Sequence, residues 1–248
     1  MNDNARLPPK AAILVARRIV GDVAAAGLVP GDRLAPEHIM VAEYGVARAT
    51  LREALRFLEL QGVVELRRGP QGGPVLRRPD AYSLETALRL LLQFTGTPFR
   101  DIVEAREGIE PMLAQLAAQR MSAVELAEVR SSVEAMEAGL DDRSTFLDSN
   151  QRFHNAIAHG SGNAVFGYLI DALLALLDGS AMGITYPERQ RVAVLQAHKR
   201  IYAALAARDG TASASAMRAH IDEYARNARR RFPATLDRPI LWADGGIA

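Results

Sequence analysis

Apolar residues near the start of the chain recur at helical spacing, and further on they gather in two short runs. The periodic segments predict three helices, and the two runs predict strands on either side of a glycine-rich, basic tip. Three short helices followed by a basic hairpin are typical of a winged helix-turn-helix, which we expect to occupy residues 1–78. The predicted helices are 11–26, 37–43 and 47–61, and the predicted strands are 63–66 and 74–76.

The remainder of the chain carries only helical periodicity. After a linker at 79–82, we expect an antiparallel all-helical bundle over 83–232 and a C-terminal tail at 233–248, which is either disordered or folded back onto the bundle. The fold class is therefore mainly α. The predicted bundle helices are 83–94, 98–120, 122–138, 144–158, 164–182, 188–208 and 211–232.

Two local signals refine this prediction. Ser122 is followed three residues later by Glu125, the spacing of a capping box that begins a helix. Pro111 lies inside a helical pattern, and because proline removes a helix hydrogen bond, we expect a break or a kink there.

Composition narrows the class of protein. The 248 residues are 49% hydrophobic and 24% charged, which is typical of a globular chain. The absence of cysteine excludes disulfides, thiolate metal sites and cysteine nucleophiles. No apolar run is long enough to span a bilayer, and residues 1–9 lack the apolar core of a signal peptide, so we expect a cytoplasmic protein with no membrane partner.

Charge is distributed unevenly along the chain. Residues 1–78 hold 12 Lys and Arg against 8 Asp and Glu, whereas the rest holds 18 against 21. Ordinary scatter of surface charge would account for these counts, but a basic first domain also suits binding to double-stranded DNA. In the predicted third helix, Arg48, Thr50 and Arg52 lie near the N-terminus, where a recognition helix reaches base edges. Arg67 and Arg68 beside the glycine tip are suited to phosphate contacts.

Residues 30–37 and 42–55, PGDRLAPE and AEYGVARATLREAL, resemble the signature of the GntR family of bacterial repressors. Residues 58–64 and 69–75 resemble its later elements, including the wing. The chain departs from the pattern at Ala35-Pro36 and at Ala47, where serine or threonine is common. The resemblance implies that the DNA-contacting positions are His38, Arg48, Ala49, Thr50 and Arg52, with Gly69 at the wing.

Histidines supply the candidate chemistry of the bundle. His154 lies four residues after Asn150, so both side chains share one side of a predicted helix, and His198 and His220 lie on later helices. Three imidazoles converging in a bundle can hold a divalent metal. The alternative is that each histidine is solvated or satisfied within the core.

The stretch Asn150–His154, the segment HKRI at 198–201 and the segment MRAHI at 217–221 resemble the FCD domain, the effector domain of FadR-like GntR regulators. Many members of that family bind zinc or nickel through one aspartate and three histidines. The resemblance therefore implies a metal site at Asn150, His154, His198 and His220. The amide of Asn150 is neutral where the family has a carboxylate, which weakens the expected metal binding.

Residues 104–111, EAREGIEP, resemble the start of the FCD domain, where relatives that bind organic acids direct the arginine into the cavity. The resemblance implies that Arg106 binds an effector carboxylate together with the four residues of the metal site, and a guanidinium suits that role. The alternative is an ion pair with Glu110, four residues later, on the helix surface.

These observations predict a homodimeric, metabolite-responsive bacterial transcription regulator. We expect it to be a repressor that a small effector, such as a carboxylate, releases from a palindromic operator. One alternative is a metal-dependent hydrolase, although the sequence contains no HExxH motif to supply a general base. The other is a DNA-binding protein that responds to no ligand.

Overall fold

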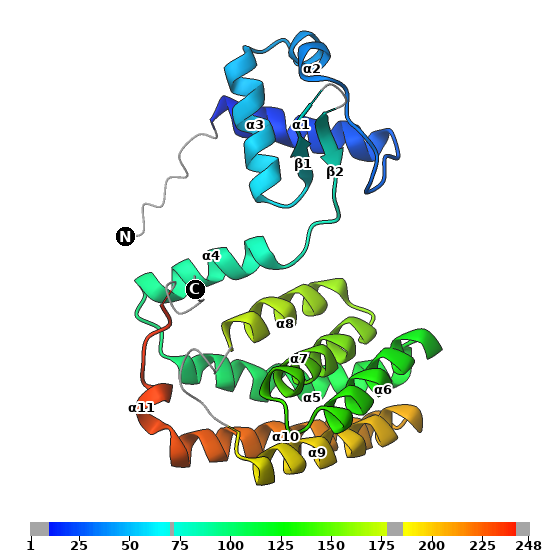
Figure 1. Cartoon of the computed structure of the whole chain (residues 1–248), viewed down its shortest axis with the longest axis vertical. Coiled ribbons are helices and arrows are strands. Elements are labelled where there is room, and N and C mark those ends of the chain that lie inside the picture. The colour runs from blue at the N-terminus through cyan, green and yellow to red at the C-terminus, as the bar shows by residue number, and fades with distance from the viewer. Residues whose placement is uncertain (1–9, 70–71, 178–185, 242–248) are drawn as a thin grey trace. The chain divides into compact units, whose positions relative to one another are not determined.

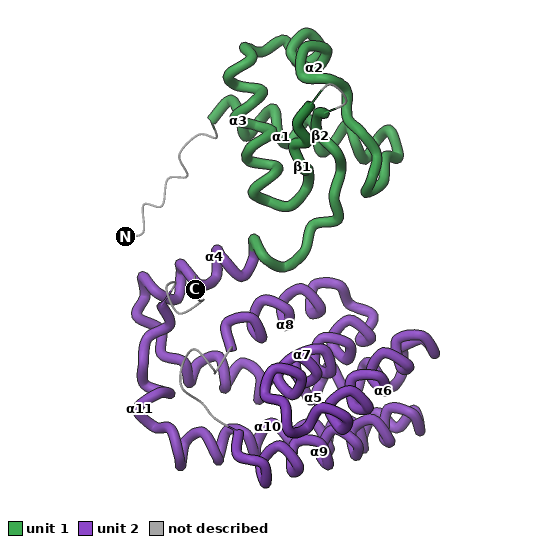
Figure 2. Tube along the Cα trace, viewed as in Figure 1, with its two compact units in different colours: residues 1–83 green, residues 84–248 purple. Residues whose placement is uncertain are grey.

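A computed structural model of the chain describes residues 10–69, 72–177 and 186–241. The structure divides into two compact units, residues 1–83 and residues 84–248 (Figure 2). The boundary lies within a helix that begins at Tyr82, next to the predicted linker.

The first unit contains three helices and a two-stranded antiparallel sheet (Figure 1). The strand register pairs Val64 with Leu76 and Arg67 with Gly73. Between the second and third helices, Gly45 adopts φ +63°, a left-handed conformation that glycine accepts without steric cost and that makes the turn tight. The elements, each within two residues of its predicted bounds, are α1 (Ala11–Ala25), α2 (Glu37–Tyr44), α3 (Arg48–Leu60), β1 (Val64–Arg67) and β2 (Gly73–Leu76).

One apolar core holds this unit together. Ile19 of α1 and Leu51 and Leu55 of α3 are almost completely buried, and Val64 and Leu76 close the core from the sheet. The buried residues of α3 recur at helical spacing, so the opposite face of that helix is free to carry exposed polar side chains.

The second unit is a helical bundle, as the sequence predicts. Helix α10 packs along α5 and α9, while α7 packs against α6 and α8 (Figure 1). The Ser122–Glu125 capping box is present: the Glu125 N–H donates to Ser122 Oγ at 3.2 Å, and the Ser122 N–H donates to Glu125 Oε2 at 2.7 Å. The helices are α4 (Tyr82–Phe94), α5 (Phe99–Arg120), α6 (Ala123–Ala138), α7 (Arg143–Gly160), α8 (Ala164–Leu176), α9 (Glu188–Ala206), α10 (Gly210–Arg231) and α11 (Pro233–Leu236).

One detail differs from the expectation, and another lies partly outside the described residues. Helix α5 continues through Pro111 without a break, because Pro111 is itself buried and the turns that follow it are fixed in the core by Leu113 and Ala114. The helix predicted to extend to residue 182 is described only as far as Leu176, and the predicted residues 178–182 lie outside the described part of the chain.

The C-terminal tail folds back onto the bundle as far as residue 241. It contains the short helix α11, and the Phe99 N–H donates to the Arg238 carbonyl at 3.0 Å. The Ile240 N–H donates to the Thr97 carbonyl at 3.1 Å, and Leu236 and Ile240 are buried. Residues 242–248 of the predicted tail lie outside the described residues.

Candidate functional site

The exposed face of α3 carries the candidate DNA-reading residues. Arg48, Ala49 and Arg52 are exposed and Thr50 is half-buried, whereas Leu51 points into the core. Arg52 Nε lies 3.9 Å from Glu37 Oε2, a contact between two largely exposed side chains that leaves the guanidinium accessible. Because Ala47 has no polar side chain to cap α3, the first N–H groups of the helix are open to an anion such as a phosphate.

The other predicted DNA-contacting residues are also accessible. His38 is exposed on α2, and Arg67 is exposed at the end of β1, where its guanidinium pairs with Glu65 at 3.3 Å. Gly69 is exposed and has φ +100°, a conformation that favours glycine and shapes the tip of the wing. The structure thus leaves each of these residues accessible on the first unit, and their contacts with DNA stay predictions.

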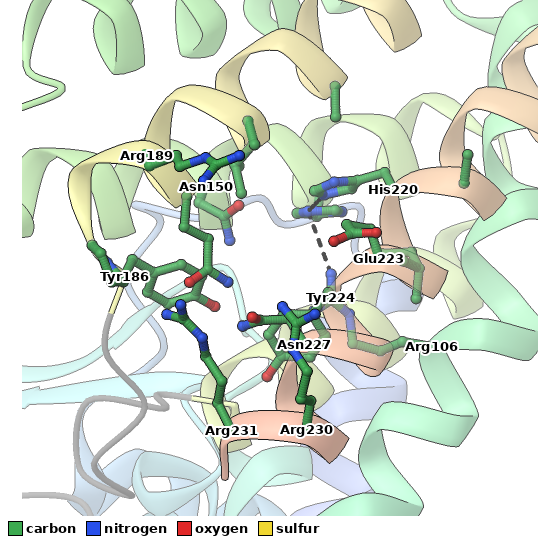
Figure 3. Close-up of a pocket in the computed structure, with 18 of the residues that line it drawn as sticks. Arg106, Asn150, Tyr186, Arg189, His220, Glu223, Tyr224, Asn227, Arg230 and Arg231 are labelled. Carbon is green, nitrogen blue, oxygen red and sulfur yellow. Dashed lines mark hydrogen bonds between the residues drawn. The ribbon is translucent and has the colours of Figure 1, made fainter.

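A cavity of about 550 Å³ lies in the second unit (Figure 3). Residues of α5, α7, α9 and α10 line it, and they include four of the five predicted effector-binding residues: Arg106, Asn150, His154 and His220. The fifth, His198, is fully buried outside the lining, where its ring stacks on Phe153 with a centroid separation of 3.7 Å.

The three histidines meet at the inner end of this cavity. His198 Nε2 lies 3.2 Å from His220 Nε2, which in turn lies 3.4 Å from His154 Nε2. One ring nitrogen from each histidine lies within 4.8 Å of the others, and all three residues are buried. Helices α7, α9 and α10 thus bring the three histidines together in one buried cluster, which excludes the solvated alternative, and their role as metal ligands stays a prediction.

A buried ion pair orients the first histidine. Arg106 and Glu110 are 5% and 2% exposed, and the Arg106 Nε–H donates to Glu110 Oε1. The other carboxylate oxygen of Glu110, Oε2, lies 2.5 Å from His154 Nδ1, which as an N–H can donate to it. His154 Nε2 then carries the lone pair, and Arg106 Nη2 lies 3.3 Å from that nitrogen (Figure 3).

Sequence reasoning treated lining the cavity and pairing with Glu110 as alternatives for Arg106, and the structure shows both. The pair is buried, so its predicted placement on the helix surface is wrong. Glu110 was not predicted as a site residue. Its spacing from Arg106 was visible, but only the fold shows that the same carboxylate also reaches His154, 44 residues away.

Burial and neighbouring charges set the protonation of this cluster. Burial alone would raise the pKa of Glu110, but Arg106 and His154 beside it hold that pKa well below its usual range. Burial lowers the pKa of His154, and burial together with the neighbouring histidines lowers the pKa values of His198 and His220 well below the usual range. The imidazoles are therefore neutral at neutral pH, the form that ligates metals.

The arrangement fits a divalent metal ion in part. Two nitrogens on one tetrahedral zinc ion lie ~3.4 Å apart, since each Zn–N bond is about 2.0–2.1 Å. The 3.2 and 3.4 Å separations of the Nε2 atoms match that spacing, and Glu110 orients His154 as a carboxylate behind a zinc-bound histidine does. Asn150 adds only a neutral amide to the cavity, and the Arg106 guanidinium places a positive charge beside the three nitrogens.

No helix within the described residues combines the length and the apolarity needed to cross a membrane. A winged helix-turn-helix unit and a helical unit with a ligand-sized cavity on the same polypeptide are typical of a ligand-responsive transcription regulator. The chain matches the family model "Bacterial regulatory proteins, gntR family" over residues 14–71 and the model "FCD domain" over residues 101–223. The chain therefore belongs to the GntR family and carries an FCD effector domain, as the sequence motifs predicted.

Known relatives agree with this membership. The chain is 26% identical over 199 residues to the HTH-type transcriptional regulator LutR of Bacillus subtilis, a match that covers 78% of this chain and 90% of LutR. It is 29% identical over 195 residues to the galactonate operon transcriptional repressor of Escherichia coli, which covers 76% and 83%. Among solved structures, a Streptococcus agalactiae GntR protein shares the fold with a TM-score of 0.68 and 23% identity, covering 87% of this chain and 99% of that one.

These findings place the chain among DNA-binding transcriptional regulators that respond to effectors. The hydrolase alternative is wrong, because the family and the relatives named above are regulators and not enzymes.

Proposed function

We propose that this protein is a repressor of a metabolic operon that an organic acid releases from its operator. The observation that carries this proposal is the cavity with Arg106 at its inner end, because a buried guanidinium next to three imidazoles suits a carboxylate. A cavity of about 550 Å³ falls within the ordinary range for small-molecule sites, which argues against a DNA-binding protein without a ligand. The relative named as a galactonate operon repressor supports an acid effector, since galactonate is a hydroxy acid.

Arg106 and the neutral imidazoles would orient the acid. The guanidinium keeps an Nη2–H near His154 Nε2, and an effector carboxylate can accept that hydrogen in place of the imidazole. Asn150 lines the same cavity and points into it in Figure 3, where its amide can donate to the ligand. His198 does not line the cavity, and in this proposal it acts on the effector through its contact with His220.

We also propose that the three histidines, with Asn150, bind a divalent ion such as zinc or nickel. When bound, the ion would supply positive charge for an effector carboxylate. The matching Nε2 separations and the Glu110–His154 contact support this assignment, and the neutral Asn150 makes the expected affinity weaker than that of a site with aspartate.

The active form in this proposal is a homodimer on a palindromic operator, with one recognition helix in each half-site. Helix α4 supports the dimer, because none of its residues is buried in the described structure and its apolar side chains Leu84, Leu91 and Phe94 are exposed. An acid that changes DNA affinity must favour one arrangement of the DNA-binding units over another, and a coupling of about 1–3 kcal/mol is usual for such a switch.

Selection of operator sequences from random DNA with the full chain, followed by fluorescence anisotropy, tests the regulator. We expect hydroxy acids to weaken operator binding, and Arg106→Gln to remove that response while leaving operator affinity in the absence of acid unchanged. Arg130→Gln is the control, since Arg130 is exposed and pairs only with Glu134 on its own helix among the described residues. An unchanged response to acid in Arg106→Gln would refute the site.

Elemental analysis of the purified chain by mass spectrometry, before any chelator is added, tests the metal. We expect about one divalent ion per chain in the unsubstituted protein. His154→Ala combined with His198→Ala should remove the ion while operator binding persists. Metal content unchanged by this double substitution would place the ion elsewhere.

A further inference from the structure

The opening of the cavity is strongly basic. Five arginines and one glutamate line the cavity, and the glutamate, Glu223, is already paired with Arg226 at 2.9 Å. Arg106, at the inner end, is paired with Glu110. The other four arginines are exposed and have no carboxylate partner among the described residues; they are Arg189 and Arg200 of α9 and Arg230 and Arg231 of α10.

Neighbouring arginines on the same two helices do have partners. Arg229, one residue before Arg230, pairs with Glu107 of α5 at 2.9 Å. Arg191, two residues after Arg189, donates to the Tyr186 carbonyl at 3.4 Å. Four exposed arginines without a carboxylate partner therefore gather at the cavity, although Arg218 of α10 is also unpaired in the described structure and lies outside the cavity. In Figure 3 Arg189, Arg230 and Arg231 extend toward the opening from opposite sides.

The helix dipole accounts for the position of some of these arginines but not of Arg189. Arg230 and Arg231 lie in the last turn of α10, where the helix dipole favours positive side chains. Arg189 is the second residue of α9, where the same dipole disfavours a positive charge. Arg189 therefore has a positive charge at an unfavourable helix end, and it faces Arg230 and Arg231 across the opening. This arrangement favours the binding of an anion.

Polar side chains between the two ends of the cavity lack partners. The side chain of Asn227, a residue that is 8% exposed, lines the cavity and has no hydrogen bond with the described residues. Gln190 Oε1 is buried without a hydrogen-bond partner in the described structure. Unpaired buried polar groups cost free energy, and ligand hydroxyl groups in the middle of the cavity would satisfy them.

We propose that the effector is a hydroxylated organic acid with a second anionic group at its far end. Its first carboxylate lies against Arg106, its hydroxyl groups face Asn227 and Gln190, and its second anion lies among Arg189, Arg230 and Arg231. This inference rests on the proposed function and narrows it from an acid to an acid with two anionic groups, which we call a dianion whatever the charge of its second group. The second group is a carboxylate or a phosphate, since both accept hydrogen bonds from arginine in the same geometry.

Calorimetric titration of the full chain with three acids of equal carbon number tests the inference. Gluconate carries one carboxylate, glucarate carries a second at the far end, and 6-phosphogluconate carries a phosphate there. We expect at least one of the two dianions to bind about tenfold or more tightly than gluconate, and the tighter of the two identifies the second group.

Variants at the opening locate the second anion. Arg230→Ala combined with Arg231→Ala should weaken dianion binding about 10- to 100-fold and gluconate binding less than about threefold. The control is Arg218→Ala combined with Arg238→Ala, which removes the same charge from exposed arginines outside the cavity and should change neither.

Three results would overturn the inference, each in its own way. Equal affinity for gluconate and both dianions would remove the second anion and leave the acid-responsive repressor standing. A loss of operator affinity in Arg230→Ala/Arg231→Ala, without a loss of dianion affinity, would assign these arginines to DNA. Binding of none of the acids by a chain that binds its operator would overturn both the dianion and the proposed acid effector.

Discussion

The buried carboxylate of Glu110 connects Arg106 to His154, so its replacement by an uncharged isostere tests the whole cluster. Glu110→Gln keeps the size of the side chain and an oxygen for the His154 Nδ1–H, but it removes the negative charge. The Arg106 guanidinium, whose side chain is 6% exposed, is then left in the core without a counterion. Arg106 donates a hydrogen bond to Glu110 within one helix, so the pair can be broken without a long-range rearrangement.

The expected cost follows from burial. Breaking a buried ion pair by removing one partner costs about 3–5 kcal/mol, because a charge remains without compensation. Glu107→Gln on the same helix is the matched control: its carboxylate pairs with Arg229, whose side chain is 53% exposed. The Glu107 side chain is 23% exposed, and an ion pair that keeps this contact with water contributes about 0–1 kcal/mol. The two variants should therefore differ in unfolding free energy by roughly 2–5 kcal/mol.

Urea unfolding of the chelator-treated full chain, followed by far-UV circular dichroism, measures this difference. With a slope of about 2 kcal/mol per molar urea, Glu110→Gln should lower the midpoint of the effector-unit transition by roughly 1–2.5 M relative to Glu107→Gln. The double variant Arg106→Met with Glu110→Gln should recover part of the loss, because it no longer buries an unpaired charge. Equal midpoints for the two single variants would refute the buried, coupled cluster.

Three further predictions concern other parts of the chain. Arg48→Ala should weaken operator binding by about 1–3 kcal/mol and relax base preference, whereas Arg17→Ala on α1 should not, as measured by anisotropy on matched and mutated operators. Ser122→Ala should lower stability by about 1 kcal/mol through loss of the capping box, while Ser131→Ala in the exposed middle of the same helix should be neutral or slightly stabilising in thermal unfolding. The pKa values of the three buried histidines are lower in the folded chain than in the unfolded chain, so the unfolded chain binds more protons at acidic pH. The unfolding free energy of the metal-free chain should therefore be full above pH 6.5 and fall as the pH drops below it. His198→Phe should make this decrease smaller.

Local sequence signals predicted much of the fold because they depend on nearby residues. Apolar spacing identified α3 and its buried Leu51, and the Ser122 capping box marked the start of α6. Of the break or kink expected at Pro111, the break did not occur, because packing of the following turns outweighs the lost hydrogen bond. Local signals could not show that the tail closes against α5 through Ile240 and Thr97, which lie more than a hundred residues apart.

The site was predictable only where a family motif or a helical repeat marked it. The histidines and Arg106 carried such marks, whereas the role of Glu110 did not, since the same i, i+4 pair occurs on exposed helix surfaces such as Arg130 and Glu134. The basic opening was also beyond sequence reasoning. Arg189 and Arg231 are separated by most of two helices, and only the packing of α9 against α10 places both on one cavity.

Charge accounting at the inner end of the cavity links the proposed metal to the proposed acid. Arg106 and Glu110 cancel each other, and the three imidazoles are neutral, so the protein offers no net negative charge to a divalent ion. The amide of Asn150 is neutral as well, and an acidic effector would supply negative charge to the ion. Metal and acid would then each strengthen the binding of the other by the same factor, because coupling between two binding sites is reciprocal. In this proposal, the neutral Asn150 weakens the binding of the metal by the chain alone, and the acid strengthens it.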